Sequence, residues 1–440
     1  MSLVDLTIER PVAGGRMLAR HDGQVVFVAG TLPGERVRAR IERTQRQVAW
    51  ATTVEVLEAS ADRREPDSDP ACGGRSYAHI AYTRQRQLKG EIVADAFRRV
   101  GRLPLDTTPA IEPSPESGYR LRARLHVRNG RAGFYREGTH VLCQAGPTGQ
   151  MVPAATEAID RLMAALGPRA ADCEAVIVAE NVAATERVAH LEPRDGARLE
   201  GLAGRLALPA GLTGVTATTS GRVVTLAGQP AVTDAAQDLF HGDSPIGRLP
   251  VWTRRASSFF QGNRFLTGAL LRRVLDLSPG ERIVDLYAGV GLFSIALAAR
   301  GGDVVAVEGD RSSSADLAAN AAAWSERLHV MHASVEDATR HSPDEAPDVV
   351  ILDPPRTGVS SEALSGLAAW RAARLVYVSC DPPTLARDAA RLVSAGYELE
   401  TVEGFDLFPN TPHVETVTSF ALKSAQRQER PASAGPAKAG

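Results

Sequence analysis

A cysteine stands directly after an apolar run near the end of the chain, in the segment VSCDPP at residues 378–383. C5 of a pyrimidine is a poor nucleophile until a thiolate adds to C6 and gives C5 enolate character. A lone cysteine in an α/β protein is more often a buried structural residue. Here the segment DPPR at residues 353–356 follows a second apolar run. The two loops together favour Cys380 as a nucleophile in methyl transfer to a nucleic-acid base.

The same chemistry needs a base that removes the C5 proton, so that the cysteine can leave. Glu415 follows an apolar, Pro-rich loop at residues 405–414 and begins the last predicted strand. Such surroundings raise the pKa of a carboxyl group toward the working pH. Glu415 by itself would be an ordinary acid at a strand start, and His413 is a rival base.

A glycine-containing loop marks the candidate cofactor site. In DLYAGVG at residues 285–291, Gly289 and Gly291 allow a tight turn and a close approach to a ligand. No third glycine follows, which favours an adenosyl sulfonium over a dinucleotide. Glu308 ends the next predicted strand, where a carboxylate can accept hydrogen bonds from both ribose hydroxyls. Arg356 stands where amino-group methyltransferases have an aromatic residue, which argues against an exocyclic amine as the target.

These loops belong to a C-terminal domain predicted at residues 251–424. Helical patterns at 292–299 and 361–370 lie between the apolar strands, which are expected at 283–286, 304–307, 349–352 and 375–378. Alternation of this kind predicts a Rossmann-like α/β domain with a doubly wound parallel sheet. Ligand sites in such a sheet lie at the carboxyl ends of the strands.

Residues 1–60 show short strands separated by turn signals, which is typical of a small OB-like β-barrel. In its third predicted strand, Arg36, Arg38 and Arg40 share one face. That basic face could meet phosphates, but charge alone favours a solvated strand face.

Residues 70–250 are predicted as a central α+β RNA-binding region. A helix is expected at 88–100 and ends at Gly101, and a hairpin turn is expected at 129–130. The strand before that turn carries four arginines on one face: Arg120, Arg122, Arg124 and Arg128. Phosphate contact and a salt-bridged face remain equally open for this strand. The role of residues 150–250 is not determined, and the tail at 425–440 has the composition of a disordered segment.

Bulk composition excludes little, because 50 basic and 52 acidic residues in 440 give a net charge of only -2. The cysteines have no CxxC spacing, which argues against a disulfide framework or a zinc site and favours a reducing cytosol; they are Cys72, Cys143, Cys173 and Cys380. No secretory pattern or long apolar span is found, so a cytoplasmic protein with no membrane partner is expected.

Taken together, the motifs resemble those of the RNA uracil-5 methyltransferases that carry an N-terminal TRAM domain. The resemblance rests on FFQGN at 259–263, followed in order by DLYAGVG, DPPR, VSCDP and the string FPNTPHVE at 408–415. It implies a TRAM barrel that grips RNA and S-adenosyl-L-methionine as cofactor. It also implies Cys380 as nucleophile, Glu415 as base, and cofactor contacts at Gln261, Tyr287, Gly289, Gly291, Glu308 and Asp353.

One departure concerns a metal cluster. Family members that act on ribosomal RNA often bind an iron-sulfur cluster through a Cys-x5-Cys-x2-Cys run and a fourth cysteine. Here Cys72 fits the middle of that run, while Pro66 and Arg75 stand at the other two positions. Because Cys143 and Cys173 are remote in the sequence, no iron-sulfur cluster and no other metal are expected.

The resulting hypothesis is methylation of a uridine C5 in RNA, with 23S ribosomal RNA preferred over transfer RNA because the long central region offers more surface. A uridine in a tRNA loop, C5 methylation of an RNA cytosine, and an inert RNA-binding protein remain alternatives. One active centre needs one chain, so a monomer is expected.

Overall fold

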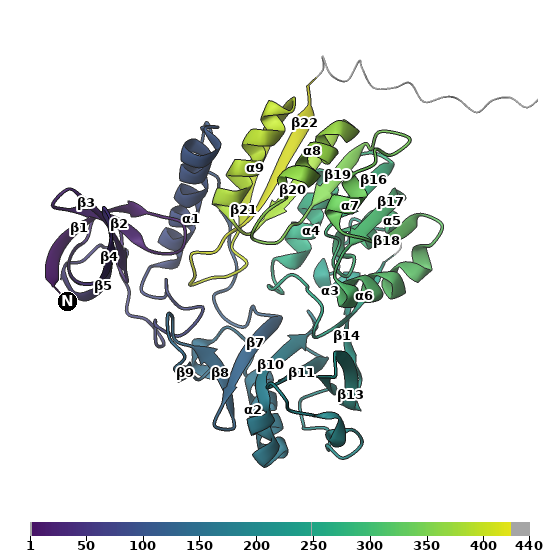
Figure 1. The fold of residues 1–440 in the computed structure, drawn as a ribbon, viewed down its shortest axis with the longest axis horizontal. Helices are drawn as coiled ribbons and strands as arrows, with labels where there is room; N and C mark the ends of the chain where they lie inside the picture. The colour runs from purple at the N-terminus through teal and green to yellow at the C-terminus, as the bar shows by residue number, and fades with distance from the viewer. Residues whose placement is uncertain (1, 248, 424–440) are drawn as a thin grey trace, which may run out of the picture.

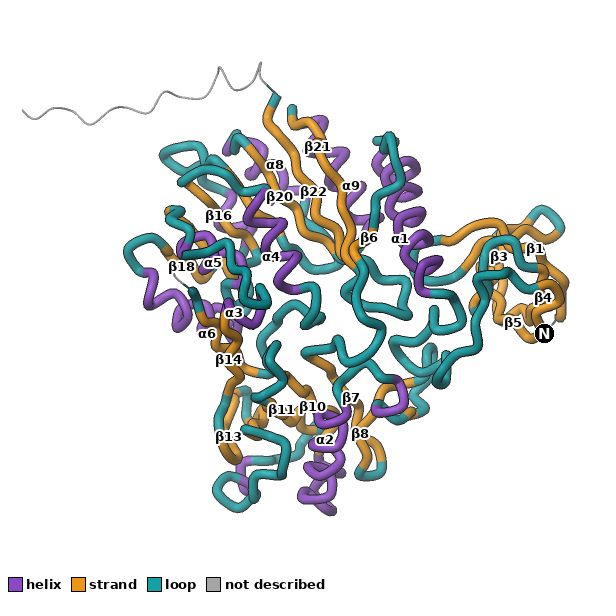
Figure 2. Tube along the Cα trace, turned by 180° about the vertical axis from the view of Figure 1, so that it is seen from behind, coloured by secondary structure: helices purple, strands orange, loops and turns teal. Residues whose placement is uncertain are grey.

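The computed structural model describes residues 2–247 and 249–423 (Figure 1). Three lobes surround a common centre, and each lobe contains its own β-sheet (Figures 1 and 2). The predicted tail at 425–440 lies outside the described residues. No helix within the described ranges is long and apolar enough to cross a membrane.

The N-terminal lobe is a closed five-stranded barrel with strand order β1-β2-β3-β5-β4. Its strands are β1 (Leu3–Pro11), β2 (Met17–His21), β3 (Gln24–Ala29), β4 (Arg36–Gln45) and β5 (Val48–Glu58). Alternating side chains such as Ile8, Val28 and Val37 fill the interior. The turn signals and alternation in the sequence predict strands at 6–8, 25–28, 36–41 and 53–57, which fall within β1, β3, β4 and β5, and give no strand at the position of β2.

The basic face of β4 is paired with acids. Arg36 Nε donates to Glu58 at 2.9 Å, and Arg38 Nε donates to Asp5 at 2.8 Å. A second ion pair joins Arg38 to Glu55 at 3.2 Å. The solvated, ion-paired interpretation therefore describes Arg36 and Arg38, and their charge is already balanced within the barrel.

A helical segment leads away from the barrel. Helix α1 (Tyr82–Ala96) continues into a π-helical turn, Phe97–Gly101, and ends at Gly101 as predicted. A Cβ at Gly101 would lie 2.8 Å from the Ala386 carbonyl oxygen, so glycine is required where this turn meets helix α9 (Pro382–Ser394). Strand β6 (Ile111–Glu112) then joins the C-terminal sheet. Part of the segment predicted as the central region thus packs with the C-terminal domain.

The central lobe contains a seven-stranded sheet of order β13-β12-β11-β10-β7-β8-β9. Its strands are β7 (Arg122–Arg128), β8 (Arg131–Tyr135), β9 (Leu142–Cys143), β10 (Cys173–Glu180), β11 (Arg187–Pro193), β12 (Gly214–Thr219) and β13 (Arg222–Gly228). The predicted turn joins β7 to β8, with Asn129 and Gly130 both at positive φ. Helix α2 (Pro153–Leu166) covers the apolar face.

The C-terminal lobe has an eight-stranded sheet of order β18-β17-β16-β19-β20-β22-β21-β6. Its strands, apart from β6, are β16 (Arg282–Leu286), β17 (Asp303–Glu308), β18 (Leu328–His332), β19 (Val349–Leu352), β20 (Arg374–Ser379), β21 (Tyr397–Phe405) and β22 (Glu415–Leu422). The strands predicted as parallel are parallel, and β22 alone runs antiparallel to its neighbours β20 and β21.

Helices cover both faces of this sheet, as expected for a doubly wound fold. One core contains α4 (Thr267–Asp276), α5 (Leu292–Ala299) and α6 (Arg311–Ala321), and the other contains α1, α7 (Val335–Thr339), α8 (Ser361–Trp370) and α9. A short connection between the lobes contains β14 (Ala231–Ala235), α3 (Ala236–Leu239) and β15 (Val251–Arg255). Short 3-10 segments lie at Gly146–Thr148, Gly167–Asp172, Glu200–Leu202 and Ala322–Trp324.

Cys72 and Cys143 form a disulfide, which corrects the expectation that no cysteines would pair. The two residues are 71 positions apart in sequence, yet their Cα atoms lie 6.0 Å apart because the chain before α1 packs on β8 and β9. At the position of an expected cluster thiol, Arg75 forms an ion pair with Asp67. Within the described residues, no three acidic, histidine or cysteine side chains are placed to hold a metal ion. The expectation that no iron-sulfur cluster is bound stays a prediction.

Candidate active site

The predicted site residues come together at one edge of the C-terminal sheet. Glu308 ends β17, Asp353 follows β19, and Cys380 follows β20. Strand β22 runs in the opposite direction, so its first residue, Glu415, lies at that same edge. The pairing of Ser379 with Thr416 brings Cys380 and Glu415 onto adjacent strands.

The loop after β16 adopts backbone conformations that favour glycine. Gly289 and Gly291 have φ values of 58° and 92°, and Tyr287 also lies in the left-handed region at 64°. An added Cβ at Gly291 would meet side chains of Leu317 and Ile295 at 2.7 and 2.8 Å. At Gly289 no atom lies within 4 Å of such a Cβ. The space above Gly289 is therefore open to a ligand.

Glu308 closes this loop from the neighbouring strand. Its carboxylate accepts the backbone N–H of Gly289 at 2.7 Å and that of Asp310 at 2.6 Å. Burial raises the pKa of Glu308, and these backbone hydrogen bonds oppose the shift. The carboxylate is thereby held at the strand end, which is the position expected for ribose recognition.

Two carboxyl groups lie behind the loop, the buried Asp285 and the half-buried Asp353. Burial raises the pKa of Asp285 to about 7, although the Ser294 hydroxyl donates to it. Burial and the charge of Asp285 raise the pKa of Asp353 to about 7, while Gln261 Nε2 donates to its carboxylate at 3.0 Å. Asp285 Oδ1 is buried without a hydrogen-bond partner among the described residues. Two carboxyls in one buried site favour a cationic ligand, so the residues fit an adenosyl sulfonium.

A pocket beside these groups brings most of the expected cofactor contacts together. Gln261, Tyr287, Gly289 and Asp353 all line it. Phe259 also lines the pocket and is 58% exposed, which is unusual for a large aromatic side chain. In the sequence, Phe259 is marked only by the paired aromatics directly before Gln261 in the motif FFQGN.

Cys380 is partly buried at the end of β20. Burial and the nearby Glu415 raise the pKa of its thiol to about 11, whereas the charge and hydrogen bond of Arg356 act in the opposite direction. The thiol is therefore protonated at neutral pH in the free protein. Arg356 was read only as a missing aromatic, but it is the cation that favours the thiolate.

Glu415 is 5% exposed. Burial and the charge of Asp353 raise its pKa well above the ordinary value, and Arg356 opposes that shift. Burial and the charge of Arg356 lower the pKa of the rival base, His413, to about 4. A carboxyl with a raised pKa is better matched to proton abstraction near neutral pH than an imidazole with a pKa of about 4.

The loop that carries Glu415 is held by residues from α1. Lys89 and Asp406 form a fully buried ion pair, and Lys89 Nζ also donates to the Phe408 carbonyl at 3.1 Å. Gln85 Oε1 accepts the Asn410 backbone N–H at 2.8 Å, and Gln85 Nε2 donates to Asn410 Oδ1 at 2.9 Å. These contacts with α1 fix the loop that leads into β22. The apolar spacing that predicts the helix in the sequence does not reveal them.

The predicted arginine row is largely engaged within the protein; Arg122, Arg124 and Arg128 lie on β7, and Arg120 lies shortly before it. Arg120 donates to Gln150 at 2.6 Å, Arg122 Nε donates to the Ala256 carbonyl at 3.0 Å, and Arg124 pairs with Glu192 at 2.7 Å. Of the two interpretations of this strand, the hydrogen-bonded and ion-paired one describes these three side chains.

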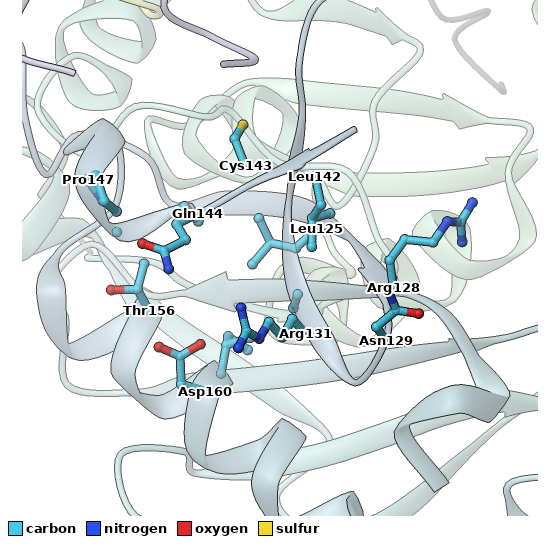
Figure 3. A pocket seen from close by; sticks show the side chains of 14 residues that line it. Leu125, Arg128, Asn129, Arg131, Leu142, Cys143, Gln144, Pro147, Thr156 and Asp160 are labelled. Carbon is cyan, nitrogen blue, oxygen red and sulfur yellow. The ribbon is translucent and has the colours of Figure 1, made fainter. Parts of the chain in front are cut away.

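A separate hollow of about 650 Å³ opens in the central lobe (Figure 3). Figure 3 shows Gln144, Thr156 and Asp160 around this space, together with Arg131 from the β7–β8 hairpin. None of the predicted catalytic or cofactor residues lines it. This hollow is therefore not part of the candidate active site.

Comparison with known proteins supports the methyltransferase site that the geometry indicates. A sequence model of tRNA (uracil-5-)-methyltransferase matches residues 246–422, and a TRAM-domain model matches residues 2–54. A 23S rRNA (uracil(1939)-C(5))-methyltransferase RlmD of Pseudomonas putida is 33% identical, over 94% of this chain and 93% of its own length. An uncharacterised RNA methyltransferase of Streptomyces coelicolor is 34% identical, over 92% of this chain and 90% of its own length.

A solved structure shares the fold along the whole molecule. It is a tRNA (uracil-54, C5)-methyltransferase of Pyrococcus abyssi in complex with S-adenosyl-L-homocysteine. Its TM-score is 0.72 at 22% identity, with 94% of this chain and 99% of that chain covered. The multidomain fold expected from the sequence is confirmed.

The doubly wound sheet, the glycine loop and the strand-end carboxylates define an S-adenosyl-L-methionine-dependent methyltransferase. The TRAM barrel, and relatives that are 33 to 34% identical over nearly the full length, narrow this class of methyltransferase to one family. The chain belongs to the RNA uracil-5 methyltransferase family.

Proposed function

We propose that this protein methylates C5 of a uridine in 23S ribosomal RNA through a covalent bond between Cys380 and C6. The observation that carries the mechanism is the pairing of β20 with β22, which puts Cys380 and Glu415 on adjacent strands. Support for the substrate comes from relatives named as 23S rRNA methyltransferases at 32 to 33% identity.

S-adenosyl-L-methionine supplies an electrophilic methyl group when bound. Cys380 loses its proton to solvent, a step that Arg356 favours electrostatically, and its sulfur adds to C6 of the uracil. The electron pair that this addition places at C5 would take up the methyl group as the bond from the methyl carbon to the sulfonium sulfur breaks, which would leave uncharged S-adenosyl-L-homocysteine. Glu415 then removes the C5 proton, the C5–C6 double bond re-forms, and Cys380 departs as thiolate.

The target uridine has to leave its stack before Cys380 can reach C6, and a loop or bulge opens at the smallest cost. One chain contributes every residue of the proposed site, so a monomer is sufficient. A cytoplasmic location follows from a ribosomal RNA substrate.

The test is transfer of labelled methyl from S-adenosyl-L-methionine to unmodified 23S rRNA and, separately, to unmodified tRNA, followed by nucleoside analysis. 5-Methyluridine in the rRNA alone is the expected result. 5-Methyluridine in the tRNA alone would replace the substrate, and 5-methylcytidine would replace the base. Absence of label from both RNAs would favour an RNA-binding protein without this activity.

A further inference from the structure

A groove of about 780 Å³ separates the barrel from α1. Clefts of roughly 300 to 1,000 Å³ hold organic ligands in many proteins. Its lining contains arginine and aromatic side chains, namely Arg10, Arg16, Arg20, Phe27, Trp50 and Arg99. Residues of the β1–β2 turn, β3 and β5 form one wall, and residues of α1 form the other. Figure 1 shows the barrel beside α1.

Two aromatic rings stand in the groove outside the barrel core. Phe27 and Trp50 are opposite each other in the β3–β5 pairing, and their ring centres are 6.1 Å apart. Their strand neighbours, such as Val26 and Ala49, point inward and fill the barrel interior. The guanidinium carbon of Arg43 lies 3.9 Å from the centre of the Trp50 ring. An aromatic pair capped by arginine is the kind of surface on which nucleobases stack.

The groove also carries excess positive charge. Four arginines line it, and Asp95 is the one carboxylate in that lining. Asp95 is shared, because Arg10 lies 3.0 Å and Arg99 lies 3.6 Å from its Oδ2 atom. Arg16 lies 3.3 Å from Glu42 and Arg20 lies 3.6 Å from Glu9, so these two groove arginines have acidic partners of their own, as Arg36 and Arg38 do on β4. The four groove arginines thus share three carboxylates, and it is the aromatic pair, more than the charge, that distinguishes the groove from the stripe.

The groove and the neighbouring β1–β2 turn approach the proposed catalytic segments. Pro383, in the first turn of α9, lines the groove three residues after Cys380. At the β1–β2 turn, a Cβ added to Gly15 would lie 2.8 Å from Pro412, in the loop before Glu415. The barrel turn is thus in contact with the loop that carries the proposed base.

From these observations we infer that the groove holds a single-stranded stretch of the substrate RNA beside the target uridine. Phe27 and Trp50 stack its bases, and the arginines contact its phosphates. This inference rests on the proposed RNA substrate, and it selects the β3–β5 face of the barrel over the arginine stripe of β4.

The test compares Trp50→Ala and Phe27→Ala with the control Val54→Ala. Val54 is on β5, is 48% exposed and is not part of the groove. Binding of a short fluorescent oligouridine and of an unmodified 23S rRNA transcript is measured at fixed salt. Each aromatic truncation should weaken binding roughly 5- to 100-fold, which is the stacking contribution of one base. Val54→Ala should bind as the wild type does.

A crosslinking experiment locates the RNA directly. Oligouridine that contains 4-thiouridine should crosslink to peptides from β3 and β5 that contain Phe27 or Trp50. Crosslinks confined to β4 or β7, or unchanged binding by both aromatic variants with intact thermal unfolding, would overturn the inference. Suppose that Trp50→Ala loses RNA binding while the wild-type protein binds RNA but transfers no methyl group. That result would support the groove as an RNA-binding site and reject the proposed function. Methyl transfer by the wild-type protein, together with unchanged RNA binding by the aromatic variants, would support the proposed function and reject the groove.

Discussion

Gln85 and Asn410 hydrogen-bond each other in both directions although 325 residues separate them in sequence. The Asn410 N–H donates to Gln85 Oε1 at 2.8 Å, and Gln85 Nε2 returns a bond to Asn410 Oδ1 at 2.9 Å. Asn410 is in the left-handed region at φ 64°, so the turn depends on these partners. A helix from the N-terminal half of the chain thereby positions the loop that leads to Glu415.

Replacing Gln85 by leucine should slow turnover without weakening cofactor binding. The loop would lose its bonds to α1, and a small displacement of a catalytic group costs up to about 100-fold in rate. We expect kcat to fall roughly 10- to 100-fold and a covalent RNA adduct to accumulate, since proton removal from C5 is the step affected. Gln87→Leu, at an exposed position of the same helix, is the matched control. A loss of kcat with no adduct would show that Gln85 does not act through Glu415.

Glu415→Gln should trap the RNA on the protein. The pKa of Glu415 is raised well above its ordinary value, so an amide resembles its neutral form and should leave the fold intact. Without a base, kcat should fall by about 10² to 10⁴ while the bond to C6 persists. A band that survives denaturation, and that is absent in Glu415→Gln combined with Cys380→Ala, is the expected readout. Fast turnover by Glu415→Gln would show that another group removes the C5 proton, and His413→Asn would be the next variant to test.

Cofactor affinity should depend on pH in a way that reveals the sulfonium charge. Asp285 and Asp353 have pKa values of about 7 in the free protein, so both lose their protons as the pH rises through neutrality. A bound cation favours the ionised carboxylates. Binding of S-adenosyl-L-methionine should therefore tighten between about pH 6 and 8. S-adenosyl-L-homocysteine has an uncharged sulfur and should change less.

Titration calorimetry of both ligands across this range checks the difference. Asp353→Asn should reduce it, because one of the two titrating carboxyls is removed. Parallel pH curves for the two ligands in the wild type would contradict the electrostatic account.

Asp285→Asn should stabilise the fold at alkaline pH at the expense of activity. The pKa of Asp285 is raised from 3.8 to about 7 in the folded protein. The contribution of its protonated form to the free energy of unfolding is therefore fully present below about pH 4 and is lost as the pH rises through 7. Asparagine keeps an acceptor for the Ser294 hydroxyl and carries no charge. The advantage of the variant in free energy of unfolding should grow by roughly 2 to 3 kcal/mol between about pH 5 and 8. Urea unfolding at the two pH values measures it, and an advantage that does not change with pH would contradict the assignment.

The local elements were predictable because their side chains follow simple periodicities. Strand β16 and helix α8 lie where the apolar patterns placed them, since apolar runs and helical spacing depend on neighbours in sequence. Strand β2 was missed because its five residues, Met17–His21, are too short to show a clear alternation. The pairing of Cys72 with Cys143 was missed because sequence separation says nothing about distance in the folded chain.

The sequence by itself determined the family, the cofactor class and the identities of the candidate catalytic residues, because these depend on short motifs whose order is enough to recognise them. Only the tertiary structure decided how those residues act together. The antiparallel entry of β22 brings Glu415 to Cys380, the approach of α1 holds the loop at Asn410, and ion pairs engage Arg36 and Arg38 on β4. These relationships arise from contacts between segments far apart in the chain, and such contacts form only when the lobes pack around a common centre.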